Sequence, residues 1–104
     1  MSKNQISIKI RNVVKLYFND ADVMLFGSRA KGNYTEDSDY DVLIVTKQDL
    51  SVAQKTPLRT AIRKDLLDFG IRSDILVQSE SEIERKKKLP GHFIRSIMKE
   101  TILL

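Results

Sequence analysis

Residues 23–45 read VMLFGSRAKGNYTEDSDYDVLIV. Two short apolar runs, 23–26 and 42–45, enclose a polar segment that starts at Gly27-Ser28 and ends at Asp39-Tyr40-Asp41. Each run has the length of a strand, and the second is apolar on both faces, which is typical of a central strand in a sheet. The segment therefore predicts a glycine turn at the end of one buried strand and a pair of carboxylates at the start of another.

The turn and the carboxylates together indicate a site for a phosphate and a metal ion. Gly27 has no Cβ, so the backbone can approach a phosphate closely, and Ser28 adds a hydroxyl and an N–H group. Asp39 and Asp41 are two residues apart, and side chains at that spacing on a strand point to the same face. Adjacent carboxylates repel unless a proton or a cation lies between them. Magnesium is the expected cation, because it commonly binds one or two carboxylates together with substrate phosphates.

The spacing of these residues resembles the signature of a known superfamily. Gly27-Ser28, ten further residues and Asp39-x-Asp41 are similar to the motif of the DNA polymerase beta-like nucleotidyltransferases. The longer string GSRAKG…SDYDVLIV resembles the minimal nucleotidyltransferases, which are small prokaryotic proteins often paired with HEPN-domain partners as toxin and antitoxin. Tyr40 stands where the family usually has an aliphatic residue, but the carboxylates remain in place.

The resemblance implies a role for each motif residue. Gly27 and Ser28 would lie against the triphosphate of ATP, and Asp39 and Asp41 would bind two magnesium ions. Asp74 corresponds to the family's third carboxylate, which follows an intervening helix, and would be a metal ligand and a candidate base for the incoming hydroxyl.

Two cations near the motif have less defined roles, and Asp74 has an alternative interpretation. Arg29 and Lys31 are the nearest cations, and we expect Arg29 to contact the phosphates, although both could be solvated loop residues. An alternative interpretation of Asp74 is a surface carboxylate paired with Arg72 or Arg29.

The remaining sequence predicts helices and one more strand around the motif. A helix over about 4–18 follows from apolar residues at helical spacing, although the alternation of Ile6, Ile8 and Ile10 leaves a short strand possible there. The other elements are recognised by their start and stop signals: a short helix at 28–31, a helix from Thr56-Pro57, with Thr56 as its N-cap, to Gly70, a strand over 72–77, a helix opened by Ser79-x-x-Glu82, and a last helical segment over 93–98. We therefore predict a small α/β fold with a mixed β-sheet packed with helices.

Composition restricts the class of protein further. The 104 residues suit one domain spanning 1–104, and no apolar run is long enough for a membrane helix. The absence of cysteine and the single histidine, His92, exclude thiolate and histidine metal clusters. With no signal peptide after Met1, we expect a cytoplasmic protein. The net charge of +4 is not accompanied by an aromatic-rich basic patch, so we do not expect direct nucleic-acid binding.

These observations predict a magnesium-dependent nucleotidyltransferase. Only about 60 residues follow Asp41, and none of them indicates a second domain, so the acceptor must come from a partner or from a second copy of the chain. The resemblance implies transfer of AMP to a hydroxyl on a HEPN-domain toxin. Three alternatives remain open: a small-molecule acceptor, an RNA 3′ end, and an antitoxin that acts by binding without catalysis.

Overall fold

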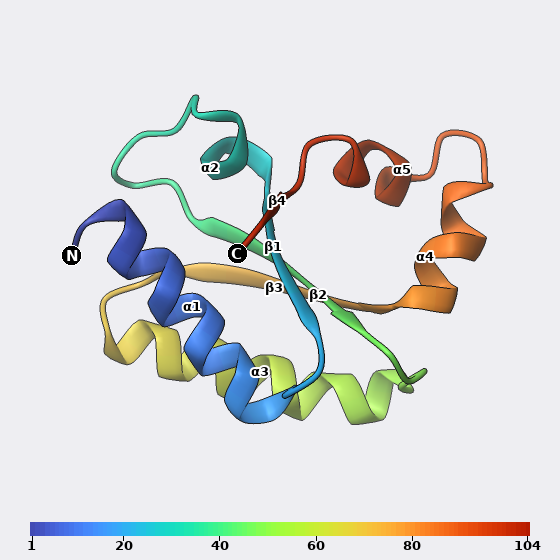
Figure 1. Cartoon of the computed structure of the whole chain (residues 1–104), viewed down its shortest axis with the longest axis horizontal. Helices are drawn as coiled ribbons and strands as arrows, with labels where there is room; N and C mark the ends of the chain where they lie inside the picture. The colour runs from blue at the N-terminus through green and yellow to red at the C-terminus, as the bar shows by residue number, and fades with distance from the viewer.

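A four-stranded sheet forms the centre of the computed structural model, which describes residues 1–104 (Figure 1). Its strands are β1 (Asp22–Phe26), β2 (Tyr40–Thr46), β3 (Ser73–Ser79) and β4 (Ile102–Leu103), in the spatial order β3-β2-β1-β4. β1 pairs antiparallel with both β2 and β4, whereas β2 and β3 are parallel. The predicted mixed sheet is therefore confirmed.

Helices cover both faces of this sheet. α1 (Lys3–Tyr17) and α3 (Val52–Asp68) lie side by side on one face, and α4 (Glu80–Lys87) and α5 (Phe93–Met98) lie toward the other (Figure 1). The short helix α2 (Gly27–Lys31) follows β1 directly. None of the helices has the length and apolar character needed to cross a bilayer.

β2 is buried on both sides, as its uninterrupted apolar run predicts. Val42 and Ile44 belong to the larger core cluster beneath α1 and α3, whereas Leu43 and Val45 pack with Ile83 and Ile94 of α4 and α5. Because side chains alternate along a strand, Asp41 shares the face of Leu43 and Val45. The candidate carboxylates thus point to the α5 side of the sheet.

The first helix resolves the ambiguity of the alternating isoleucines. Ile10 is completely buried, Ile6 is half-buried and Ile8 is exposed, which is the pattern of an amphipathic helix and not of a strand. The helix begins after Ser2, whose side chain caps it in a box with Gln5.

The predicted start of α3 at Thr56-Pro57 is wrong by five residues. Ser51, and not Thr56, is the N-cap, and a capping box joins its side chain to Gln54. Pro57 lies inside the helix and leaves the carbonyl of Ala53 without its usual N–H donor. Ala53 is exposed, so water can hydrate that carbonyl. Ser51-x-x-Gln54 is the signal that the sequence analysis missed.

β4 is the element that the sequence did not predict. Its two residues pair with Met24 and Leu25 and form the edge of the sheet beside β1. A two-residue strand carries no detectable period, so only the tertiary pairing defines it.

The predicted capping box at the start of α4 is confirmed. The Oγ of Ser79 accepts a hydrogen bond from the N–H of Glu82 at 3.1 Å, and the Glu82 carboxylate accepts one from the N–H of Ser79 at 3.0 Å. The same Ser79 hydroxyl donates to Asp49, and Glu82 also binds Lys55 of α3 at 2.8 Å. This buried cap therefore ties the end of β3 to α3 and α4.

Replacing Ser79 by alanine tests this connection. We expect Ser79→Ala to lower the free energy of unfolding by about 1–2 kcal/mol, because the cap and the partly buried hydrogen bond to Asp49 are both lost. Ser96→Ala is the matched control, since that hydroxyl is exposed and makes no hydrogen bond. Urea unfolding measures both variants, and equal midpoints would contradict the account.

Candidate functional site

Three strands bring the motif residues to one corner of the sheet. Phe26, the last residue of β1, is the register partner of Asp41 in β2, and Asp41 is the partner of Asp74 in β3. Gly27 follows Phe26 at once, so the glycine turn and two of the carboxylates meet across three neighbouring strands. α2, drawn in teal in Figure 1, begins at this corner.

Gly27 is in contact with the Asp41 carboxylate. Its φ of +71° is in the left-handed region, and a Cβ built on it would lie 2.2 Å from Oδ2 of Asp41 and 3.1 Å from Cγ. Any side chain here would collide with the carboxylate and would also strain the backbone. The structure therefore explains the glycine of the motif by its backbone conformation and by the close approach of the β1–α2 turn to Asp41.

The fold disfavours the ionised form of Asp41. Burial, followed by the negative charges of Asp74 and Asp39, raises the pKa of Asp41 above its ordinary value. A positive ion between these oxygens would remove the repulsion, and a hard cation such as magnesium prefers oxygen ligands. The donor set of Asp41 and Asp74 therefore fits a divalent cation beside a phosphate.

Asp39 is paired with an arginine. It precedes β2 at the end of the polar loop, and its Oδ1 lies 3.6 Å from Nε of Arg72. No three acidic or histidine side chains lie close enough together in the structure to hold a metal ion jointly. The alternative pairing of Arg72 with Asp74 is not observed, because Arg72 pairs with Asp39 and donates a hydrogen bond to the carbonyl of Asp37.

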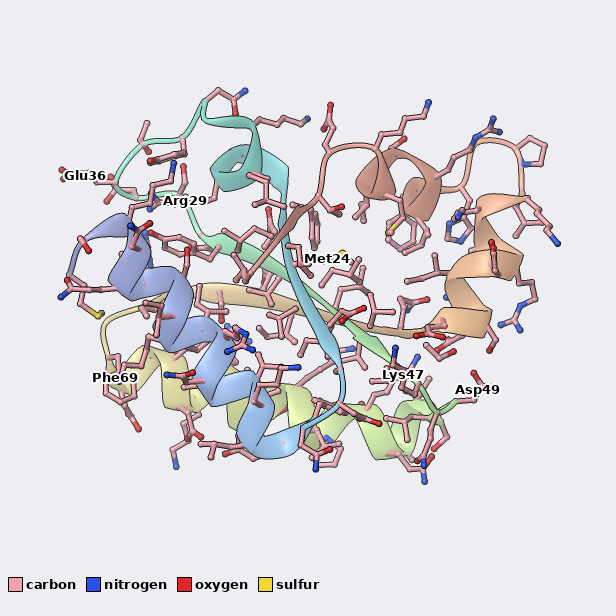
Figure 2. All side chains as sticks on the ribbon, in the orientation of Figure 1. Met24, Arg29, Glu36, Lys47, Asp49 and Phe69 are labelled. Carbon is pink, nitrogen blue, oxygen red and sulfur yellow. The ribbon has the colours of Figure 1, made fainter.

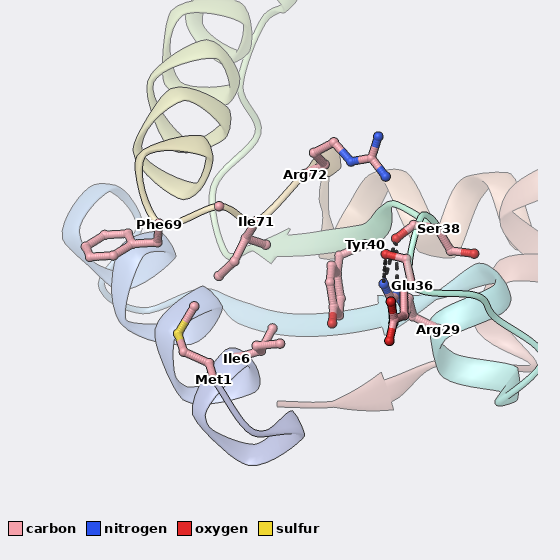
Figure 3. A pocket seen from close by; sticks show the side chains of 10 residues that line it. Met1, Ile6, Arg29, Glu36, Ser38, Tyr40, Phe69, Ile71 and Arg72 are labelled. Carbon is pink, nitrogen blue, oxygen red and sulfur yellow. Dashed lines mark hydrogen bonds between the residues drawn. The ribbon is translucent and has the colours of Figure 1, made fainter.

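Arg29 organises the loop between α2 and β2. Its guanidinium lies 4.3 Å from each of the rings of Tyr34 and Tyr40. Nε and Nη2 donate to the carbonyl of Ser38 at 3.1 and 2.9 Å, and Nη2 also donates to Glu36 at 3.2 Å (Figures 2 and 3). Arg29 thus holds the chain that leads into Asp39. This role was missed, because the sequence does not show which carbonyls a loop arginine reaches.

Ser28 has a free hydroxyl. It is half-buried at the start of α2, and its side chain makes no hydrogen bond within the protein. Nη1 of Arg29 is likewise without a hydrogen-bond partner. Both groups remain able to contact a phosphate, so their expected roles stay predictions.

The largest hollow in the structure, of about 370 Å³, is not at the carboxylates. It lies beneath the polar loop, between α1 and the turn before β3 (Figure 3). Its lining includes Ile6, Tyr40, Ile71 and Arg72, and none of the three aspartates. The carboxylate site is open to solvent, since Asp39 and Asp74 are exposed and Asp41 is half-buried.

Comparison with known proteins gives the family of the chain. Residues 7–104 match the nucleotidyltransferase domain, and the chain belongs to that family. It is 33% identical over 97 residues to "Putative protein adenylyltransferase MJ0604" of Methanocaldococcus jannaschii, an alignment that covers 93% of this chain and 84% of the relative. The chain is accordingly an enzyme of the transferase class.

Two solved structures share the fold. "Structure of putative minimal nucleotidyltransferase" superposes with a TM-score of 0.64 at 24% identity, over 100% of this chain and 97% of the other. "Crystal structure of the toxin-antitoxin with AMP-PNP" gives a TM-score of 0.62 at 14% identity, over 98% of this chain and 72% of the other. The expected nucleotidyltransferase fold is confirmed.

The raised pKa of Asp41 predicts how one substitution changes stability with pH. The native state holds the Asp41 proton more tightly than the unfolded chain does. Ionisation of Asp41 therefore lowers the free energy of unfolding at neutral pH, and this loss disappears when the pH falls below the ordinary pKa of an aspartate. We therefore expect Asp41→Asn, in EDTA, to melt higher than wild type at about pH 7 and to lose this advantage toward about pH 4. Glu36→Gln, an exposed acid in the nearby loop, is the control. A lower melting temperature for Asp41→Asn at neutral pH would contradict the assignment.

The contacts of Arg29 predict a local effect on the loop. Arg29→Lys keeps the charge but loses the fork that binds two carbonyls, so amide hydrogens of residues 33–38 should exchange faster. Hydrogen exchange read by mass spectrometry measures this, with Arg11→Lys on the exposed face of α1 as the control. Unchanged protection of the loop would show that Arg29 does not hold it.

Proposed function

We propose that this protein transfers AMP from ATP to a hydroxyl group on a partner protein, with magnesium as the cofactor. The observation that carries the proposal is the contact between the Gly27 turn and the Asp41 carboxylate, beside Asp74. A phosphate cradle and a pair of acidic metal ligands then lie side by side. The name of the Methanocaldococcus relative, a protein adenylyltransferase, supports a protein acceptor.

Each motif residue has a role in this proposal. Gly27 and Ser28 bind the triphosphate, and Asp39, Asp41 and Asp74 together hold two magnesium ions. Arg29 positions the loop that leads into Asp39, and its Nη1 is left free for a phosphate. Magnesium, when bound, lowers the pKa of the acceptor hydroxyl and neutralises charge on the leaving pyrophosphate.

Asp39 must leave Arg72 to join the metal site. The two side chains are about half exposed, and an exposed ion pair of this kind contributes at most about 1 kcal/mol. The free energy needed to release Asp39 from Arg72 is therefore small compared with the free energy gained when a divalent cation binds. Until then, Arg72 keeps Asp39 close to the site and spares Asp41 a closer third negative charge.

The transfer step follows from these positions. Asp74 accepts the proton of the acceptor hydroxyl, and the hydroxyl oxygen forms a bond to the α-phosphorus. The bond from the α-phosphorus to the oxygen of the β-phosphate breaks, and pyrophosphate leaves on the side opposite the attack. Positioning of the two reactants supplies most of the catalysis, because no protein side chain forms a covalent bond.

The proposed partner is a HEPN-domain toxin. The resemblance of the motif to the minimal nucleotidyltransferases implies it, and the solved toxin–antitoxin with AMP-PNP supports a paired system that binds an ATP analogue. Asp39 and Asp74 are exposed, which suits an acceptor segment delivered by another chain. A second copy of this chain is the alternative source of the acceptor, and the same geometry is compatible with it.

Intact-mass spectrometry after incubation with a HEPN-domain partner, ATP and magnesium tests the proposal. We expect wild type to add the mass of AMP to the partner and Asp39→Asn to add none, because a metal ligand is lost while the binding surface is kept. Asp37→Asn, an exposed acid two residues away, should retain activity. Co-purification confirms that each variant still binds the partner.

Two results would overturn the proposal in different ways. A partner that is fully inhibited but never modified would favour an antitoxin that acts by binding alone. Transfer that survives in Asp39→Asn, Asp41→Asn and Asp74→Asn alike would show that the metal ligands are misassigned.

A further inference from the structure

A small basic hollow lies next to Asp74, on the side away from the glycine turn. Its volume is about 130 Å³, and it is lined by Arg59, Thr60 and Arg63 of α3 together with Asp74 and Ile75 of β3. Arg59 and Arg63 are four residues apart on a helix, so their side chains lie on the same face. Both arginines and Asp74 therefore line the same opening at the β3 edge, with the arginines on the α3 side and the Asp74 side chain on the face that it shares with Leu76.

Neither arginine has a partner within the chain. The ion pairs of the structure use Arg72 and several lysines, and Arg59 and Arg63 form no ion pair or side-chain hydrogen bond. Both residues are exposed. Like charges four residues apart destabilise a helix slightly, so an unpaired couple is not explained by the stability of α3. The charges are free to bind an anion from outside.

The strand order places this hollow on the acceptor side of the proposed reaction. Asp41 lies between Phe26-Gly27 on one side and Asp74 on the other. The Gly27 turn is the proposed triphosphate site, whereas β3 is the outermost strand on the opposite side. A molecule that approaches Asp74 over the β3 edge passes Arg59 and Arg63.

The lining indicates the kind of ligand. Guanidinium groups bind carboxylates and phosphates through paired hydrogen bonds, whereas the Thr60 hydroxyl already donates to the carbonyl of Thr56 at 3.0 Å. No aromatic side chain lines the hollow, and single-stranded nucleic acids are usually bound by stacking of their bases on such side chains. Side-chain carboxylates of a protein are therefore the better match.

We propose that Arg59 and Arg63 form a subsite that binds acidic residues next to the acceptor hydroxyl of a protein substrate. The inference rests on the proposed function, since it identifies the chemical class of that reaction's acceptor. The nucleotide and the acceptor then bind on opposite sides of Asp41. The subsite positions the acceptor chain and does not touch the nucleotide.

Fluorescence polarisation with two labelled peptides tests the subsite. One peptide has a single tyrosine flanked by glutamates, and the other has glutamines in their place. Wild type should bind the glutamate peptide more tightly, and Arg59→Gln/Arg63→Gln should bind it about tenfold more weakly, which corresponds to the loss of one charge-assisted hydrogen bond. The matched control is Arg11→Gln/Lys64→Gln, which removes two positive charges from exposed positions outside the hollow.

The possible results separate the subsite from the general charge of the protein. Weakening by the Arg59/Arg63 pair alone supports the proposal. Equal weakening by both double variants, or no preference for the glutamate peptide, overturns it. Tighter Arg59- and Arg63-dependent binding of a single-stranded RNA oligonucleotide would overturn it in favour of a nucleic-acid acceptor.

Calorimetry with ATP and magnesium keeps this inference distinct from the proposed function. Arg59→Gln/Arg63→Gln should bind ATP as wild type does, because neither residue lies on the Gly27 side. If wild type fails to bind ATP, the proposed function fails, while the peptide comparison still decides the subsite. Loss of ATP binding in the double variant alone would place the arginines in the nucleotide site and overturn the subsite.

Discussion

The contact between the Gly27 backbone and the Asp41 carboxylate is the constraint on which the rest of the site depends. It requires a residue without a side chain at position 27, in a left-handed conformation, directly after β1. It also requires β2 to run antiparallel beside β1, with Asp41 opposite Phe26. The fold therefore keeps a half-buried carboxylate in contact with the glycine turn.

This arrangement disfavours the ionised form of one carboxylate. Asp41 is partly removed from water and lies near two other acids, so its ionised form is disfavoured in the free protein. The apolar clusters on both faces of β2 hold the strand in place despite that cost. The ion pair of Asp39 with Arg72 and the stacking of Arg29 between two tyrosines keep the adjoining loop ordered without closing the site.

Much of the fold could be predicted from local patterns, because glycine turns, capping signals and apolar runs act over a few residues. The mixed sheet, α1, α4 and the short helix after Gly27 follow from such signals. The start of α3 was misplaced because Pro57 was taken as the first helical residue, although a proline in the second turn is tolerated when the affected carbonyl is exposed. β4 has only two residues and depends wholly on pairing with β1. Motif spacing predicted Gly27, Asp41 and Asp74 as candidate site residues, and the fold brings these three together. Local patterns do not encode contacts between residues that are distant in sequence. Three features of the site depend on such contacts: the ion pair of Asp39 with Arg72, the hydrogen bonds of Arg29, and the position of Arg59 and Arg63 beside Asp74.

A crystal structure with magnesium and a non-hydrolysable ATP analogue tests the central claim most directly. The account predicts that the triphosphate lies against Gly27 and Ser28, with magnesium bound to Asp41 and Asp74 and with Asp39 turned from Arg72 toward the metal. An analogue bound in the hollow beneath the loop, with Asp39 still paired to Arg72 and no metal at Asp41, would contradict it.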